Sequence, residues 1–414
     1  MVASTQSHPS AVWKDQRAIT LLLAATLTVM ANATISPALP GIEEEFAGTW
    51  NAGLLTRFLV SAPSLTVLVC APIAGWFADK YGRRGMLLAG IALFAFSGSA
   101  GLVLPNLTMI MASRLLLGVA VAMIMTAQTA LIGDYFTGDA RKSMMGLQTS
   151  ARNFGGLIFI TSAGWLALVS PRLPFVIYAA AIILLPFVAR HLLEPPQETR
   201  KKDTSGSSER GPQTRWRLLL LGLAILQMTT SLAFFMIPTQ LPFFLASLGG
   251  DDAAMTGMLL GALTLSGGLA ALLYVRTNRK LGSAGAYAIG YALMSGGFLL
   301  LTVGEDTLRL SVAVVAIGAG FATVMPNFVA LALTLSPASQ RGTVGGVLTA
   351  AVFLGQILSP MVSIPGIATG GFFGLFRAVA ALLAALAFSA VVWALIPRLR
   401  TIILTPSEVL RRSK

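Results

Sequence analysis

Long apolar runs alternate with short polar segments along almost the whole chain. Each run has about 20 or more mostly apolar residues, the length that an α-helix needs to cross a bilayer. Twelve such runs are present, and a polar stretch rich in Pro, Ser, Lys and Glu divides them into two sets of six. The expected spans are residues 18–40, 53–78, 86–104, 108–136, 144–169, 173–192, 216–247, 253–275, 284–303, 308–335, 343–366 and 372–396.

This pattern predicts an all-α polytopic membrane protein with 12 transmembrane helices in two pseudo-symmetric six-helix bundles. We expect an N-terminal bundle over residues 1–193, a cytoplasmic linker over 194–214 and a C-terminal bundle over 215–414 with a short basic tail. The first apolar run is long enough to span the membrane, and no small-residue cleavage site follows a short apolar core. We therefore expect a retained helix and not a removed signal peptide.

Composition supports a surface that faces lipid. The chain is 55% hydrophobic and only 11% charged, whereas soluble domains carry about 25% charged residues. The net charge of +13 does not point to nucleic acid, because the basic residues stand in short clusters between apolar runs and form no recognition motif. The single cysteine, Cys70, lies inside an apolar run, so neither a disulfide framework nor a thiolate metal site is expected.

The basic residues gather on one side of the expected membrane. With twelve spans, 23 of the 29 Lys and Arg residues lie on the side that holds both termini. The opposite side carries acidic groups at Glu43 to Glu45, Asp251 with Asp252, and Glu305 with Asp306. The positive-inside rule therefore predicts that both termini and the linker are cytoplasmic, in an inner or plasma membrane.

The second half repeats features of the first half 200 residues later. Six glycines of the first half meet a glycine at this shift: Gly82, Gly85, Gly90, Gly118, Gly146 and Gly155. Duplicated membrane halves imply a site at their interface near the bilayer midplane, opened alternately to each side. That geometry serves transport and not catalysis, and no metalloprotease, nucleophile-elbow or phosphate-loop motif occurs. We therefore expect no catalytic residue, no metal and no cofactor.

A polar motif stands between the second and third spans, from Gly75 to Gly85. Gly75 permits close helix approach, and Gly82 permits a turn with positive φ. The carboxylate of Asp79 suits a helix N-terminus. Lys80, Arg83 and Arg84 suit the anionic surface of the inner leaflet. An ordinary solvated turn with basic anchors is the alternative interpretation.

This motif resembles the cytoplasmic loop signature of the major facilitator superfamily, Gly-x-x-x-Asp-(Arg/Lys)-x-Gly-Arg-(Arg/Lys). The resemblance implies that Asp79 holds one state of the transporter by meeting a helix end of the other half, near residues 342–345. Arg114 with Gly118 resembles the Arg-x-x-x-Gly signature of the fourth span. The run from Asn32 to Ile42 is similar to the first-helix signature of drug:proton antiporters, although Asn32 stands where an acid is common. The antiporter signature of the fifth span is mostly missing.

Charged and polar residues inside the spans are the candidates for the substrate cavity, because intramembrane charge is costly and usually functional. Asp134 is either a gate partner of Arg83 or Arg84 or a plain interfacial carboxylate. Arg114 and Arg152 either face the cavity or snorkel to the interface, and Arg57 and Arg377 are expected to snorkel. Gln128 shares the helix stripe of Arg114. Phe234 either lines an apolar pocket or faces lipid. Each of the other polar candidates contacts substrate or joins helices: Asn32, Asn153, Gln227, Asn327 and Gln356.

These features predict a monomeric secondary transporter, in contact with lipid and a small-molecule substrate, that exports an amphipathic drug or metabolite by alternating access. The family resemblance favours coupling to the proton gradient. The spans contain almost no carboxylates, and two of their arginines, Arg114 and Arg152, are candidates for the cavity, which favours the alternative of a facilitator or organic-anion exporter without tight proton coupling. A membrane receptor or enzyme is the minor alternative from another class.

Overall fold

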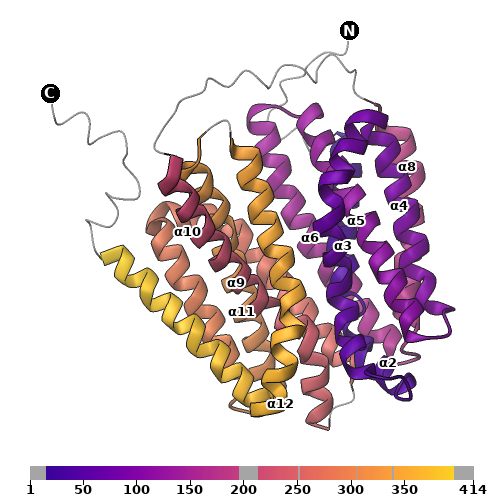
Figure 1. Cartoon of the computed structure of the whole chain (residues 1–414), viewed down its shortest axis with the longest axis vertical. Helices are drawn as coiled ribbons and strands as arrows, with labels where there is room; N and C mark the ends of the chain where they lie inside the picture. The colour runs from indigo at the N-terminus through magenta and orange to yellow at the C-terminus, as the bar shows by residue number, and fades with distance from the viewer. Residues whose placement is uncertain (1–14, 195–212, 250–251, 305, 338–339, 396–414) are drawn as a thin grey trace. The chain divides into compact units, whose positions relative to one another are not determined.

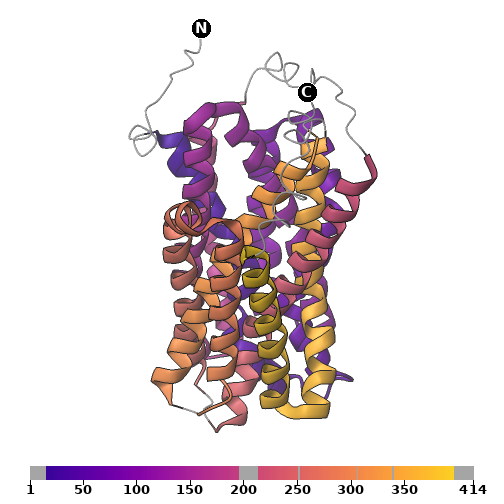
Figure 2. The same cartoon turned by 90° about the vertical axis from the view of Figure 1, so that its left-hand side faces the viewer.

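The structure is a computed structural model that describes residues 15–194, 213–249, 252–304, 306–337 and 340–395. These residues are α-helical with short 3-10 turns, and the described part of the chain contains no strand. Figures 1 and 2 show the helices. Their bounds are α1 Gln16–Ala33, η2 Ser36–Ala38, α2 Leu39–Glu45, α3 Ala52–Tyr81, α4 Arg83–Ser99, η3 Ala100–Leu102, α5 Leu107–Tyr135, α6 Gly138–Ala167, η4 Leu173–Phe175, α7 Val176–Ala179, η5 Ala180–Ile183, α8 Leu184–His191, α9 Gln213–Ser247, α10 Ala253–Leu300, α11 Thr307–Leu335 and α12 Arg341–Leu395.

The apolar runs fold into helices as expected, and the chain is an all-α, multi-pass membrane protein. Ten helices of the described residues are long and apolar enough to cross a bilayer. One of them, Thr343–Leu395, contains two expected spans, because the chain turns back at Gly371 with φ of 66° (Figure 1). The fifth expected span is the 30-residue helix α6, which is too polar in its first half to be one of the ten. Twelve spans are consistent with this arrangement.

The chain divides into two compact units. Unit 1 holds the described residues of Met1–Lys202 together with Met236–Leu265 and Ser359–Met361. Unit 2 holds the described residues of Asp203–Phe235, Ser266–Leu358 and Val362–Lys414. Because α9 and α10 belong to both units, the compact units are not the same as the two predicted sequence halves. The prediction of paired six-helix bundles over 1–193 and 215–414 stays a prediction.

The sequence repeat reappears in the packing within each unit. Gly82 joins α3 to α4 with φ of 102°, and Gly282 bends α10 with φ of 66° at the equivalent place. Gly90 of α4 packs against Ile124 of α5, and Gly290 of α10 packs against Val324 of α11, each 200 residues later. Both units therefore contain the same helix-to-helix contact, which supports the inference of a duplication.

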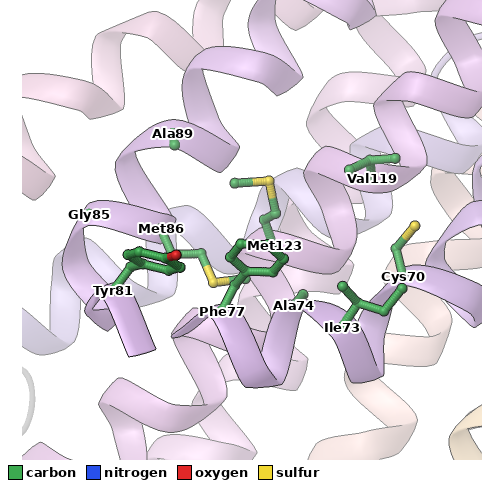
Figure 3. Close-up of a pocket in the computed structure, with 10 residues that line it drawn as sticks. All are labelled: Cys70, Ile73, Ala74, Phe77, Tyr81, Gly85, Met86, Ala89, Val119 and Met123. Atoms are coloured by element: carbon green, nitrogen blue, oxygen red, sulfur yellow. The ribbon is translucent and has the colours of Figure 1, made fainter. Parts of the chain in front are cut away.

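Three helices of unit 1, α3, α4 and α5, pack side by side and leave an apolar groove on their surface (Figure 3). Its volume is about 460 Å³, and its lining comes from all three helices. Cys70, Phe77 and Tyr81 of α3, Met86 of α4 and Met123 of α5 are among the lining residues. Among the described residues, the lone cysteine is thus part of an apolar surface, as expected for a small apolar side chain.

The closest approach of α3 and α5 depends on Gly118. A Cβ added there would lie 2.2 Å from the carbonyl oxygen of Pro63 and 1.9 Å from Oγ1 of Thr66. The Thr66 hydroxyl donates a 2.7 Å hydrogen bond to the carbonyl of Leu115, which joins the two helices. Small residues that permit such backbone approach are the usual means of helix association in membranes, where the hydrophobic effect contributes little.

We expect Gly118→Ala to destabilise the protein by about 1–3 kcal/mol, because the new methyl group overpacks a contact with backbone. Thermal unfolding of the purified protein in detergent measures the effect. Gly146→Ala in α6 is the matched control, since nothing lies within 4 Å of a Cβ at that helical position. Equal melting temperatures for the two variants would remove the inferred role of Gly118.

Candidate functional site

The signature motif from Gly75 to Gly85 contains the join of α3 and α4 at Gly82. We refer to this join and the first residues of α4, Gly82 to Arg84, as the signature loop. The carboxylate of Glu194 accepts hydrogen bonds from the backbone N–H groups of Arg83 and Arg84, at 2.7 and 2.8 Å. These N–H groups open α4 and have no partner within the helix. A Cβ on Gly82 would lie 3.1 Å from the Glu194 carboxylate. Glu194 therefore caps α4 from the first residue of the predicted linker, a contact that the sequence patterns did not reveal.

The arginines of the loop bind groups of neighbouring helices in unit 1. Arg83 forms an ion pair with Asp134 at the end of α5 and donates a 3.2 Å hydrogen bond to the carbonyl of Ala130. Arg84 donates to the carbonyl of Ala189 in α8 at 2.6 Å. The predicted pairing of Asp134 with Arg83 is present in the structure, and its gating role stays a prediction.

Gly75 and Lys80, two other residues of the signature motif, make different contacts from the two arginines. A Cβ added to Gly75 would lie 3.9 Å from the side chain of Thr126 in α5. This is an ordinary van der Waals distance, so the packing does not require a glycine at this position. Lys80 is exposed, with Nζ 4.8 Å from the ring centroid of Trp76 and 5.3 Å from that of Tyr81. The side chain of Asp79 lies outside the described residues, so the latch predicted for it stays a prediction.

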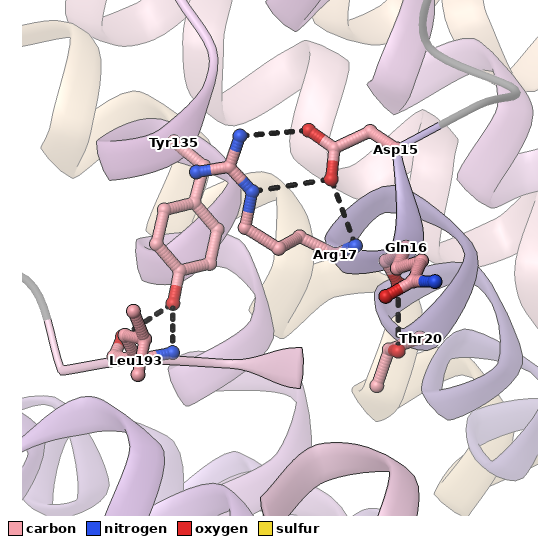
Figure 4. Close-up of polar contacts among 6 residues, drawn as sticks. All are labelled: Asp15, Gln16, Arg17, Thr20, Tyr135 and Leu193. Atoms are coloured by element: carbon pink, nitrogen blue, oxygen red, sulfur yellow. Dashed lines mark hydrogen bonds and ion pairs between the residues drawn. The ribbon is translucent and has the colours of Figure 1, made fainter. Parts of the chain in front are cut away.

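A second set of contacts joins the start of α1 to the same region (Figure 4). Asp15 caps α1 by accepting a 2.8 Å hydrogen bond from the backbone N–H of Arg17, and it accepts two more from the Arg17 side chain. The Arg17 guanidinium lies 5.2 Å from the ring centroid of Tyr135. The Tyr135 hydroxyl donates to the carbonyl of Leu193 and accepts a 3.1 Å hydrogen bond from the Leu193 N–H. This end of unit 1 is thus held by α1, α4, α5 and the residues after α8.

The other end of unit 1 is held by Arg57 of α3. Its Nη1 lies 2.9 Å from the Glu43 carboxylate, and its Nε donates to Oε1 of Gln240 at 3.3 Å. The guanidinium carbon lies 3.7 Å from the ring centroid of Phe243 in α9. The expectation that Arg57 snorkels is therefore wrong, because an acid, an amide and a ring enclose the cation. We refer to Glu43, Arg57, Gln240 and Phe243 as the outer clamp.

Helices α6 and α10 also touch through glycines within unit 1. A Cβ on Gly164 would lie 2.9 Å from Cα of Gly257, and one on Gly261 would lie 2.3 Å from Oγ1 of Thr161. The Thr161 hydroxyl lies 3.5 Å from the carbonyl of Gly257. The first part of α10 therefore packs on α6 as closely as two backbones allow.

Arg114 and Gln128 are fully buried in unit 1. Arg114 donates to the carbonyl of Gly98 at 2.9 Å, and its guanidinium lies 4.7 and 4.6 Å from the ring centroids of Phe175 and Tyr178. Gln128 donates to the carbonyl of Leu21. Arg114 thus does not snorkel; it joins α4 and α5 to the η4–α7 segment. Contact of Arg114 or Gln128 with substrate stays a prediction. The same holds for Gly118, which packs against α3.

The remaining candidates of unit 1 lie on α1 and α6. Asn32 is half-buried and has a polar partner. Asn153 donates to the carbonyl of Thr149 in its own helix at 3.0 Å. Arg152 is half-buried, and its Nε has no hydrogen-bond partner among the described residues. Within the described residues, Arg152 therefore has no ion-pair partner, and its place in the substrate cavity stays a prediction.

Four candidates lie in unit 2. Asn327 is buried, accepts a 3.1 Å hydrogen bond from the Tyr274 hydroxyl and donates to the carbonyl of Thr323. Phe234 stacks on Phe321 with ring centroids 3.8 Å apart. Gln227 and Gln356 are buried, and Oε1 of Gln227 has no partner among the described residues. These contacts give Asn327 and Phe234 a role in joining helices and leave contact with substrate a prediction.

Long apolar helices, a duplicated packing pattern and a charged loop between the second and third spans define a polytopic transporter. A family model described as Major Facilitator Superfamily matches residues 21–360. The chain belongs to the major facilitator superfamily.

Relatives and solved structures agree with this assignment. Multidrug resistance protein 1 of Bacillus subtilis (strain 168) is 25% identical over 360 residues, which are 84% of this chain and 90% of that protein. Quinolone resistance protein NorA of Staphylococcus aureus is 30% identical over 155 residues, 37% of this chain and 39% of that protein. A D-xylose-proton symporter has a TM-score of 0.73 at 18% identity, with 93% of this chain and 98% of that chain covered. The human organic anion transporter MFSD10 has a TM-score of 0.69 at 19% identity, with 91% and 99% covered.

We expect Glu194→Ala to expose the first amides of α4, because the residue caps that helix. The rate of hydrogen–deuterium exchange in a peptide covering residues 82–90 should rise several-fold. The free energy of unfolding should fall by about 0.5–1 kcal/mol, because the cap lies at an exposed position. Glu194→Gln should give a smaller change. The exposed Glu44, whose side chain has no polar partner among the described residues, supplies the control Glu44→Ala. Unchanged exchange in Glu194→Ala would contradict the cap.

The Asp15 carboxyl should give a small pH-dependent contribution to stability. Partial burial alone would raise its pKa, but hydrogen bonds from Arg17 and the Arg17 charge lower the pKa below the ordinary value of 3.8. The contribution is therefore present above pH of about 4 and is lost as the pH falls through the lowered pKa. The difference in melting temperature between wild type and Asp15→Asn should shrink on acidification, and an increase would contradict the assignment.

Proposed function

We propose that this transporter exports amphipathic small molecules by alternating access and uses the proton gradient. The observation that carries this proposal is the similarity to Multidrug resistance protein 1 of Bacillus subtilis over 84% of this chain and 90% of that protein. The partial similarity to quinolone resistance protein NorA supports it. We further propose a monomer in the inner or plasma membrane, with both termini cytoplasmic, no bound cofactor, and lipid and small-molecule substrate as its partners.

In this proposal the two ends of unit 1 have different tasks. With cytoplasmic termini, the outer clamp closes the extracellular end, because Arg57 of α3 holds Gln240 and Phe243 of α9. Outward opening then requires the guanidinium to leave Phe243. At the cytoplasmic end of unit 1, the contact of Glu194 with the first residues of α4 and the ion pair of Arg83 with Asp134 remain intact.

A second candidate function is export of organic anions without tight proton coupling. The observation that favours it is Arg152, a cation within the span α6 that has no ion-pair partner among the described residues. A charge inside a membrane helix is costly, and usually it marks a functional path. An anionic substrate would provide the missing partner, and its carboxylate or sulfonate would accept charge-assisted hydrogen bonds from the guanidinium.

A substrate-panel flux assay in vesicles, with and without an imposed pH gradient, tests both functions. We expect flux to depend on the gradient and lipophilic cations to be poor substrates. Arg152→Gln should slow anion export about tenfold, equal to about 1.4 kcal/mol, and Arg152→Lys should restore part of it. Asp79→Asn should impair transport more than expression and serves as the transport-deficient reference.

The outcomes separate the two functions. Flux that is equal with and without the gradient contradicts proton coupling. Strong export of ethidium-like cations by wild type, lost in Asp79→Asn, contradicts anion selectivity. If Arg152→Gln affects no substrate of the panel, the proposed role of Arg152 is wrong.

A further inference from the structure

Unit 2 contains an apolar groove at one end of its helices. The groove has a volume of about 380 Å³ and is formed by the start of α9, the part of α10 after Gly282, the end of α11 and the end of α12. This volume lies within the range of ligand pockets, about 300–1,000 Å³. Leu223, Tyr287, Tyr291, Leu331, Ser389 and Trp393 are among its lining residues.

Two hydrogen-bond donors in the groove wall have no acceptor in the part of the chain that the structure describes. The hydroxyl of Tyr287, a residue that is 4% exposed, and the indole Nε1 of Trp393 are both buried and unpaired among the described residues. Their ring centroids lie 6.5 Å apart. The neighbouring Tyr291 differs, because its hydroxyl lies 2.8 Å from Oγ1 of Thr230. Of the tyrosine and tryptophan side chains in the wall, Tyr287 and Trp393 thus lack an acceptor among the described residues, whereas Tyr291 has a partner.

A buried donor without an acceptor carries a free-energy cost, and its covered position keeps water from pairing with it. A ligand that removes this cost must present an oxygen acceptor to the two donors and an apolar chain to the rest of the groove. Among the described residues, no Asp, Glu, Lys or Arg lines the groove, so the part of the groove seen here offers no buried ion pair for recognition. A glycerophospholipid has this chemistry, with ester and phosphate oxygens beside long acyl chains.

The position of the groove fits a lipid of one leaflet. Leu218 stands near the start of α9, Leu335 ends α11 and Trp393 stands near the end of α12, so the groove lies at helix ends where a span meets the headgroup region. Tyr and Trp are enriched at this depth because their polar ends meet the interface. Leu218 is 65% exposed, so the groove continues into the surface that faces lipid.

We propose that this groove binds a glycerophospholipid, with an acyl chain along its leucines and an ester or phosphate oxygen that accepts hydrogen bonds from Tyr287 and Trp393. Both polar atoms are covered by protein, so binding includes a small rotation of the rings. The proposal rests on the membrane placement of the chain and is independent of the transported substrate.

Lipid binding to the full-length protein, purified and delipidated in detergent, tests the proposal. Native mass spectrometry counts bound phosphatidylglycerol, and thermal unfolding with and without that lipid measures its stabilising effect. The variants are Tyr287→Phe and Trp393→Phe. Tyr81→Phe is the matched control, because Tyr81 lines the similar groove of unit 1 but is 67% exposed (Figure 3).

We expect Tyr287→Phe to weaken phosphatidylglycerol binding at least fivefold, while Tyr81→Phe leaves it unchanged. Without lipid, Tyr287→Phe should be as stable as wild type or more stable, because it removes an unpaired donor. Equal lipid binding by wild type and Tyr287→Phe would overturn the proposal. So would displacement of the lipid by a transported substrate in the flux panel, which would assign the groove to transport. Trp393→Phe removes the other donor and should also weaken phosphatidylglycerol binding, which tests the proposal independently of Tyr287.

Discussion

The membrane interior offers no hydrogen-bond partner, and this constraint explains most of the structure. Every backbone group inside the bilayer must be paired within its own helix, so the chain is built of helices and its unpaired amides lie at helix ends. Those ends are the places where the protein uses its few carboxylates. Asp15 caps α1, Glu194 caps α4 and Asp252 accepts from the first amides of α10 at 2.9 and 3.1 Å. Capping fixes the helix starts, while the charge stays near the interface.

The same constraint makes small residues and aromatic rings the means of helix association. Gly118 brings α5 onto α3, and Gly164 meets Gly257 between α6 and α10. The cation of Arg114 is enclosed by Phe175 and Tyr178, since a guanidinium over aromatic rings gains a favourable interaction even without a carboxylate. A buried arginine is therefore not by itself a sign of a substrate site. Arg152 differs, because the described residues supply neither an acid nor a ring beside it.

The helices and the family could be predicted from the sequence, because both depend on local patterns. Runs of about 20 apolar residues and the turn glycines Gly82 and Gly282 are visible in the spacing along the chain. The pairing of Arg83 with Asp134 is one of the two interpretations that the sequence leaves open for Asp134, and the structure contains it. Glu194 and Arg57 could not be found this way, since their partners lie 111 and 183 residues away. A carboxylate at the end of a span, directly before two prolines, was the available signal for Glu194. For Arg57, no local pattern indicates that α9 contributes Gln240 and Phe243 as its neighbours, so snorkelling is the expectation.

The different bonding of the two ends of unit 1 has a consequence for movement. At the signature loop, each contact joins elements that precede residue 195. At the outer clamp, Arg57 reaches Gln240 and Phe243, which lie in the segment of α9 that belongs to unit 1. In the alternating access proposed above, a movement of this segment of α9 against α3 would break the contact with Phe243, while the ion pair of Arg57 with Glu43, within the first 60 residues, would be kept. Glu43 would then keep the cation paired when the ring departs, so that opening would cost one cation–π contact and one long hydrogen bond and leave no unpaired charge in the membrane.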